Sequence, residues 1–342
     1  MKVRVIGHNK KPFLPPTRNN PWHAFFNYIK NNGGILVSGP SGEKFDALIA
    51  NSHSRKAIRE CVKYGVSKNN RILILWESKE VNGKLYKIST FSNYGHIFSL
   101  SRGWAKNSST HNFKWPQGRA KLLRQTEKKW LSRKNKFVFI GSNKYSVSRG
   151  ELYSLRRVIL RNTKSKKFID LFGHGWNKSF IYDFKDVVSS LIKTNYKNYS
   201  INSIRLFARK YTNYQGISLN KNDTLNKYKF ALIIENSTEY ISEKLFEALE
   251  NECIVLYVGG NLKENDLNKN IAVSASTNTA DVFDKLNKIL NLSNKEHLVL
   301  LKRQQKEYLK IVEEWNNYKI LGQIARESMQ VLNFKHIPPR QF

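Results

Sequence analysis

The 342-residue sequence predicts an α/β protein with two domains that face a central cleft, each built around a parallel sheet. Three observations support this prediction. Apolar runs of strand length alternate with amphipathic helical stretches in both halves of the chain. Residues 101–135, between the halves, lack apolar periodicity and are typical of surface loops and a linker. The chain is also long enough for two cores. We expect domains at 1–131 and 132–295, then C-terminal helices and a tail at 296–342.

In the first half, strands and helices follow one another closely. The expected strands are 2–7, 34–38, 45–51, 71–76 and 94–100, and the expected helices are 21–30 and 55–64. The strand at 71–76 is a strong one, because it is almost entirely apolar, and it ends at Glu77 and Ser78.

The second half restarts with a strand at 136–141, followed by a loop that contains Ser142 and Asn143. We expect the next helix to begin near Ser148 and Arg149, with Leu152, Leu155 and residues 158–160 on its apolar side. Further strands are expected at 168–173 and 271–274, and further helices at 184–192, 201–211, 281–290, 296–318 and 321–332.

Residues 228–260 form the most informative stretch. An apolar run at 230–234 predicts a strand buried on both faces, and a second follows at 253–258. Between them Ser242 stands where a helix N-cap is wanted, before a helix at 243–251. Polar side chains therefore collect at the carboxyl end of a strand, where open α/β sheets bind ligands. Glu243 and Lys244 occupy the first helical turn, which suits a phosphate, although an ordinary βαβ unit with solvated charges has the same pattern.

The charge is strongly positive, with 59 Lys and Arg against 26 Asp and Glu, a net +33. Such a surplus attracts polyanions: nucleic acid, anionic lipid headgroups or an acidic glycan. The basic residues are spread along the chain, without a basic arm or zinc-finger spacing, and a short cluster such as Arg156 and Arg157 is expected to be a solvated face.

Two cysteines, Cys61 and Cys253, fall within predicted elements and are expected to be core residues rather than part of a disulfide or zinc site. No apolar run approaches the roughly 20 residues that span a bilayer. The N-terminus lacks the apolar region of a secretory signal, so we expect a cytoplasmic protein.

Four stretches resemble the glycosyltransferase family 10 fucosyltransferases, in the family's order. The densest is residues 228–260, YKFALIIENSTEYISEKLFEALENECIVLYVGG, which resembles the family signature around EN and EK. Ser142 and Asn143 followed by Arg149 resemble its SN loop, and residues 169–173, IDLFG, resemble its VDxYG strand. Residues 75–78, LWES, and then 91–98 resemble its acceptor-side Glu loop.

This resemblance implies a GT-B-like fold with two Rossmann-type domains and an inverting transfer of fucose from GDP-fucose. Arg149 and Lys244 would neutralise the diphosphate, so the resemblance implies no metal and no further cofactor. Asn236, Tyr240 and Glu243 would hold the ribose and fucose hydroxyls. Ser142, Asn143 and Glu235 lie in the matching motifs and complete the expected donor site.

On the acceptor side, the resemblance makes Glu77 the general base, with Glu80 as a competing carboxylate nearby. The expected acceptor is a glycan or a lipid-linked saccharide, reached through an anionic membrane surface from the cytoplasmic side. Two alternatives stay open: a GT-B transferase that uses another GDP-sugar, and a non-enzymatic, basic nucleic-acid-binding α/β protein. Of these, we regard nucleic acid as the less favoured partner.

Overall fold

The structure is a computed structural model of the chain, and it describes residues 1–6, 23–37, 43–100, 109–114, 126–146, 148–162, 165–177, 211–239, 241–315 and 317–332. The chain forms two compact units, Met1–Arg119 with Glu314–Phe342, and Ala120–Glu313. The helix predicted at 184–192, and all but the last residue of the one predicted at 201–211, lie outside the described residues.

The first unit contains a six-stranded parallel sheet with the order β2-β1-β3-β4-β5-β6. The strands are β1 (Lys2–Ile6), β2 (Ile35–Val37), β3 (Ala47–Ala50), β4 (Arg71–Leu75), β5 (His96–Ser99) and β6 (Thr110–Asn112). The five predicted strands are thus confirmed, with slightly shorter bounds. The edge strand β6 was not predicted, because its three polar residues gain their order only by pairing with β5.

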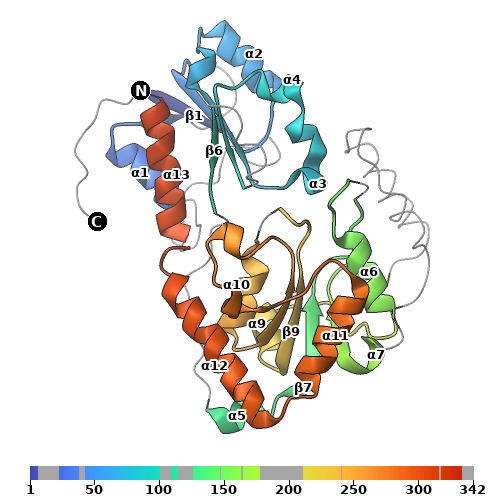
Figure 1. The fold of residues 1–342 in the computed structure, drawn as a ribbon. Helices are drawn as coiled ribbons and strands as arrows, with labels where there is room; N and C mark the ends of the chain where they lie inside the picture. Colours follow the sequence, from blue (N-terminus) through green and yellow to red (C-terminus); the bar gives the residue numbers. More distant parts are fainter. Residues whose placement is uncertain are drawn as a thin grey trace. The chain divides into compact units, whose positions relative to one another are not determined.

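Helices cover both faces of this sheet (Figure 1). On one face α1 (His23–Asn31) packs against α13 (Asn317–Val331). On the other, α2 (Arg55–Lys63) buries Ala57 and Cys61 in a core with side chains of β3 and β4, and α4 (Ile88–Phe91) contributes Phe91. The short elements of this unit are η2 (Lys68–Asn70), α3 (Lys79–Asn82) and η3 (Gly83–Tyr86).

The second unit contains a five-stranded parallel sheet with the order β11-β10-β9-β7-β8. The strands are β7 (Lys134–Ile140), β8 (Ile169–Phe172), β9 (Tyr228–Ile234), β10 (Ile254–Val258) and β11 (Val273–Ser274). Every residue of the central strand β9 is buried, which confirms the prediction of a strand covered on both faces. Cys253, just before β10, is buried as predicted, as is Cys61.

The described helices of the second unit pack against this sheet (Figure 1). They are α5 (Glu127–Leu131), α6 (Tyr153–Arg161), α7 (Ser165–Phe168), α9 (Lys221–Leu225), α10 (Glu243–Glu250), α11 (Thr279–Leu290) and α12 (Asn294–Ile311), with η6 (Lys263–Asn265) and η7 (Lys269–Ile271) between β10 and β11. Among the described helices, none combines the length and apolar composition that crossing a bilayer requires.

One helix begins later than predicted. The sequence predicts a start near Ser148 and Arg149, but α6 starts at Tyr153. Gly150 adopts a φ of 91°, and Glu151 forms an antiparallel bridge with Ser237. This stretch therefore pairs with the loop after β9 instead of forming the first helical turn.

The C-terminal helices belong to different units, whereas the sequence predicts one region at 296–342 and a domain boundary after residue 131. Helix α12 is fastened to the second unit, because the Gln304 carboxamide makes hydrogen bonds of 2.9 and 3.2 Å with the backbone N–H and carbonyl of Val255. Helix α13 belongs to the first unit, and Trp315, just before it, is buried with Lys114 over its ring. The observed units divide at residues 119 and 314.

Gly173, just after β8, packs closely against Gly141, which follows β7. Its φ is 133°, and a Cβ there would overlap the carbonyl oxygen of Gly141. Gly216 also has a positive φ of 105°, but a Cβ there would meet nothing within 4 Å. We predict that Gly216→Ala lowers the free energy of unfolding by about 1–3 kcal/mol through backbone strain alone. Gly173→Ala should cost clearly more, as measured by denaturant unfolding, and equal losses would contradict the close approach.

Candidate functional site

The carboxyl ends of β7 and β9, neighbours in the second sheet, gather most of the predicted donor-site residues. Ser142 and Asn143 follow β7, and Glu235 and Asn236 follow β9. Glu243 and Lys244 open α10, the helix between β9 and β10. Because parallel strands end at the same sheet edge, these motifs, almost 100 residues apart in the chain, lie together.

Glu235 is the central charge of this edge, and its side chain is fully buried. Its Oε1 accepts a hydrogen bond of 2.8 Å from the backbone N–H of Ser242, and the Ser242 hydroxyl lies 2.9 and 2.7 Å from the two carboxylate oxygens. The Lys244 ammonium lies 3.1 Å from Oε2 and 2.8 Å from the Ser242 hydroxyl. A buried carboxylate is tolerated when it is paired and hydrogen-bonded in this way. Glu235 therefore ties the end of β9 to the start of α10.

The first turn of α10 presents positive charge at this edge. Ser242 is the N-cap predicted from the sequence, and its side chain accepts from the backbone N–H of Lys244. The Lys244 side chain keeps 19% of its surface exposed. Glu243, also in the first turn, is half-buried. The backbone N–H groups and the dipole of the helix add to the attraction for an anion.

The loop after β7 is held by the neighbouring strand's loop. The backbone N–H of Asn143 donates to His174 O at 2.8 Å, and its side-chain Nδ2 donates to Gly175 O at 3.0 Å. The Trp176 indole N–H donates to Gly141 O at 2.6 Å. Asn143 is buried, whereas Ser142 is partly exposed. Asn143 therefore shapes the loop, and Ser142 is the more accessible of the two.

Arg156 and Arg157 on α6 correct the prediction of a solvated basic face, since both are buried, at 3% and 0% exposure. Arg156 donates to Ile234 O, at 3.0 Å from Nε and 2.5 Å from Nη2, and to Asn236 Oδ1 at 2.8 Å. Arg157 donates to Lys144 O at 2.6 Å, and burial lowers its pKa. Each arginine fastens one loop: Arg156 the one after β9, and Arg157 the one after β7.

A signal for this pair was present in the sequence. Tyr153 and Leu160 of the same helix are both buried. Arg156 and Arg157 each stand three or four residues from both of them. That spacing places them on the covered face of the helix. Val158, which the sequence predicts on the apolar side, is 38% exposed instead.

The remaining two predicted donor residues are Arg149 and Tyr240. Arg149 is exposed in the turn before α6 and makes no hydrogen bond or ion pair with the described residues. Tyr240 lies outside the described residues. Within the described residues, no group of three or more His, Cys, Asp or Glu side chains is arranged to hold a metal ion.

Glu77 lies in the first unit, two residues after the end of β4, and its side chain is partly exposed. Its backbone carbonyl accepts a hydrogen bond of 2.6 Å from the Tyr86 hydroxyl. The competing carboxylate, Glu80, is in α3 with its residue only 3% exposed, and Lys79 Nζ lies 3.8 Å from its Oε1. Glu77 is thus the more accessible of the two carboxylates.

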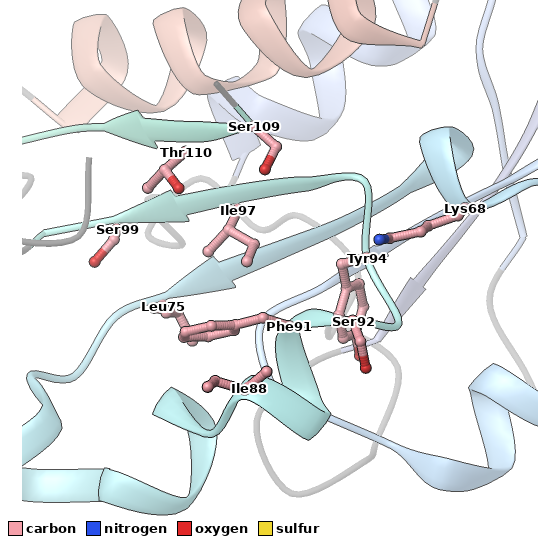
Figure 2. Close-up of a pocket in the computed structure, with 10 residues that line it drawn as sticks. All are labelled: Lys68, Leu75, Ile88, Phe91, Ser92, Tyr94, Ile97, Ser99, Ser109 and Thr110. Atoms are coloured by element: carbon pink, nitrogen blue, oxygen red, sulfur yellow. The ribbon is translucent and has the colours of Figure 1, made fainter. Parts of the chain in front are cut away.

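A pocket of about 250 Å³ opens in the first unit beside the end of β4 (Figure 2). Its floor is formed by side chains of β4, β5 and β6, and α4 supplies the opposite wall. The lining residues are Lys68, Leu75, Ile88, Phe91, Ser92, Tyr94, Ile97, Ser99, Ser109 and Thr110. No pattern in the sequence indicates this pocket, because its described lining comes from five separate elements.

The fold is similar to that of solved glycosyltransferases. A crystal structure of an α1,3-fucosyltransferase matches with a TM-score of 0.54 and 13% identity, covering 93% of this chain and 92% of that one. An α1,3-fucosyltransferase with GDP matches at 0.52 and 12%, covering 92% of each chain. Anabaena Alr3699/HepE in complex with UDP and glucose matches at 0.54 and 10%, covering 96% of this chain and 99% of that one. These similarities confirm the predicted α/β fold of GT-B type.

A comparison with curated protein sequences finds no match. The profile of glycosyltransferase family 10 (fucosyltransferase), C-terminal part, matches residues 132–336, which is more than half of the chain and includes the whole edge formed by β7, β9 and α10. The chain therefore belongs to glycosyltransferase family 10, as the resemblance of residues 228–260 indicated.

Proposed function

We propose that this protein transfers fucose from GDP-fucose, with inversion, to a hydroxyl of a glycan or of a lipid-linked saccharide. The observation that carries the proposal is the cluster of Glu235, Ser242 and Lys244 at the carboxyl end of β9, inside the region that matches the fucosyltransferase family. This cluster holds a cation and a helix N-terminus at the sheet edge where α/β proteins bind nucleotides.

Lys244 and Arg149 are the proposed partners of the diphosphate. When the bond to the sugar breaks, the leaving GDP gains negative charge, and cations fixed beside it stabilise the transition state. Glu235 offsets part of the charge of Lys244, since their atoms lie 3.1 Å apart. A second cation is therefore needed, and Arg149 can supply it with two donors toward one phosphate. With both cations supplied by side chains, we propose that the diphosphate needs no metal.

The other donor contacts follow from the same edge. We propose that Asn236, Tyr240, Glu243 and Ser142 contact the ribose and fucose hydroxyls. Arg156 donates to Asn236 Oδ1 at 2.8 Å, which holds this side chain at the carboxyl end of β9. Glu235 and Asn143 are buried, which supports positioning roles for them in place of direct contact with the sugar.

Glu77 is the proposed general base that takes the proton of the acceptor hydroxyl. A carboxylate at the end of a strand, partly exposed and fixed through its backbone by Tyr86, suits this role. We further propose a cytoplasmic protein that works at an anionic membrane surface. The net charge of +33 supports that proposal, as do the exposed Lys302, Arg303 and Lys306 on α12.

The donor proposal predicts that GDP and GDP-fucose raise the melting temperature. A ligand at 100 times its Kd stabilises the folded state by about 2.7 kcal/mol. Lys244→Met and Arg149→Met should reduce the shift in differential scanning fluorimetry. Lys227→Met, an exposed lysine at the amino end of β9, is the matched control and should leave the shift unchanged.

Two results would count against this assignment. If no guanine nucleotide stabilises the protein, the transferase proposal is wrong. If UDP or GDP-mannose raises the melting temperature as much as GDP-fucose does, the protein does not select GDP-fucose as its donor.

The acceptor proposal predicts that Glu77→Gln lowers the transfer rate by about 10²–10⁴-fold, the usual contribution of a general base. Stabilisation by GDP should be unchanged, because Glu77 acts on the acceptor. Glu43→Gln, which removes an exposed carboxylate of the same unit, should keep full activity. If Glu80→Gln abolishes transfer and Glu77→Gln does not, the base is Glu80.

A further inference from the structure

The pocket of the first unit has a mixed but mainly apolar lining. Leu75, Ile88, Phe91, Ile97 and the ring of Tyr94 supply its hydrophobic surface, and the other described lining residues are three serines, one threonine and one lysine. Its described lining contains no carboxylate and no carboxamide, the groups that usually recognise the hydroxyls of a sugar through several hydrogen bonds. Figure 2 shows Leu75, Ile88 and Phe91 close together on one side of the pocket. This chemistry suits a hydrocarbon group better than a saccharide.

The pocket is connected to Glu77 in two ways. Leu75 lines it and stands two residues before Glu77, so their Cα atoms are at most about 7 Å apart. Phe91 also lines the pocket, and its ring packs edge-on against Tyr86, which donates a hydrogen bond to the Glu77 carbonyl. If the acceptor hydroxyl of a saccharide lies at Glu77, a group attached to that saccharide can reach the pocket. The distance to be spanned is roughly one sugar unit.

The mouth of the pocket has an unusual exposed side chain. Ile88, on the short helix α4, is 85% exposed although it is a large aliphatic residue. Ile88 would be covered if a hydrocarbon group entered the pocket beneath it, and burial of both surfaces would favour binding.

We propose that this pocket binds an apolar aglycone, an alkyl or aryl group carried by the saccharide acceptor. The inference rests on the proposed function, because it assigns the pocket to the acceptor whose hydroxyl Glu77 would deprotonate. The acceptor would then be an amphipathic glycoside, with its sugar at the end of β4 and its hydrocarbon group along β4, β5 and α4.

The direct test compares two ligands that differ only in the apolar group. Methyl β-D-glucoside and n-octyl β-D-glucoside, the latter below its micelle concentration, are titrated into the full chain by isothermal calorimetry. Each methylene buried strengthens binding about fourfold, so burial of only part of the chain should make the octyl compound bind at least about tenfold more tightly. Ile88→Ser should weaken octyl binding about fivefold or more. Ser109→Trp, which fills the pocket, should abolish the difference between the two glucosides.

The matched control is Val62→Ser, since Val62 is also an exposed aliphatic side chain on a helix of the first unit, 68% exposed and outside the pocket lining. It should leave octyl binding unchanged. Equal affinity for the two glucosides overturns the proposal, and so does an equal loss in Val62→Ser and Ile88→Ser, which would mean adventitious detergent adsorption only.

The same protein distinguishes this failure from failure of the proposed function. Stabilisation by GDP reports on the second unit and does not depend on an aglycone. If GDP binds and transfer to methyl and octyl glycosides of one sugar shows the same KM, the pocket assignment is wrong and the transferase remains. If octyl binding is selective but no guanine nucleotide binds, the transferase proposal fails and the pocket is not an acceptor site.

Discussion

The buried carboxylate of Glu235 constrains the whole sheet edge formed by β7, β9 and α10. A fully buried charge must be surrounded by donors, and here they come from the backbone and hydroxyl of Ser242 and from the ammonium of Lys244. This requirement determines how closely α10 approaches the end of β9. Together with Tyr257 it also explains the glycine that follows β10, because a Cβ at Gly259 would overlap the Tyr257 hydroxyl and lie 2.6 Å from Glu235 Cγ.

The two buried arginines extend this constraint to the neighbouring strand. Arg156 and Arg157 are consecutive on α6, yet they donate to loops that follow different strands, β9 and β7. A guanidinium carries five donors in a rigid plane, so it can satisfy several carbonyl groups that a strand end leaves unpaired. The buried side chains of Arg156 and Arg157 thus hold the two loops that contain Asn236 and Ser142. Arg149, by contrast, is exposed and is free to meet a ligand.

The candidate site of the first unit differs from that of the second, because the surface of a sheet forms its floor. The apolar pocket runs along β4, β5 and β6 and reaches the end of β4, next to Glu77. The opposite face of the same sheet is covered by α1 and α13, so the last described helix of the chain completes the core of the first unit. The candidate residues of the second unit lie where strands end, whereas the pocket of the first unit lies between the sheet and α4.

Local sequence determined the strands, most helices and the strand-loop-helix unit at 228–250, because an apolar run such as 230–234 and a cap such as Ser242 depend on neighbours in the chain. The resemblance around residues 228–260 likewise predicted the family. Tertiary structure decided the rest: the late start of α6, which Glu151 causes by pairing with Ser237, the burial of Arg156 and Arg157, and the division of α12 from α13. It also decided the pocket, whose lining spans residues 68–110. These features depend on contacts between residues far apart in the chain, which hydrophobic periodicity does not record.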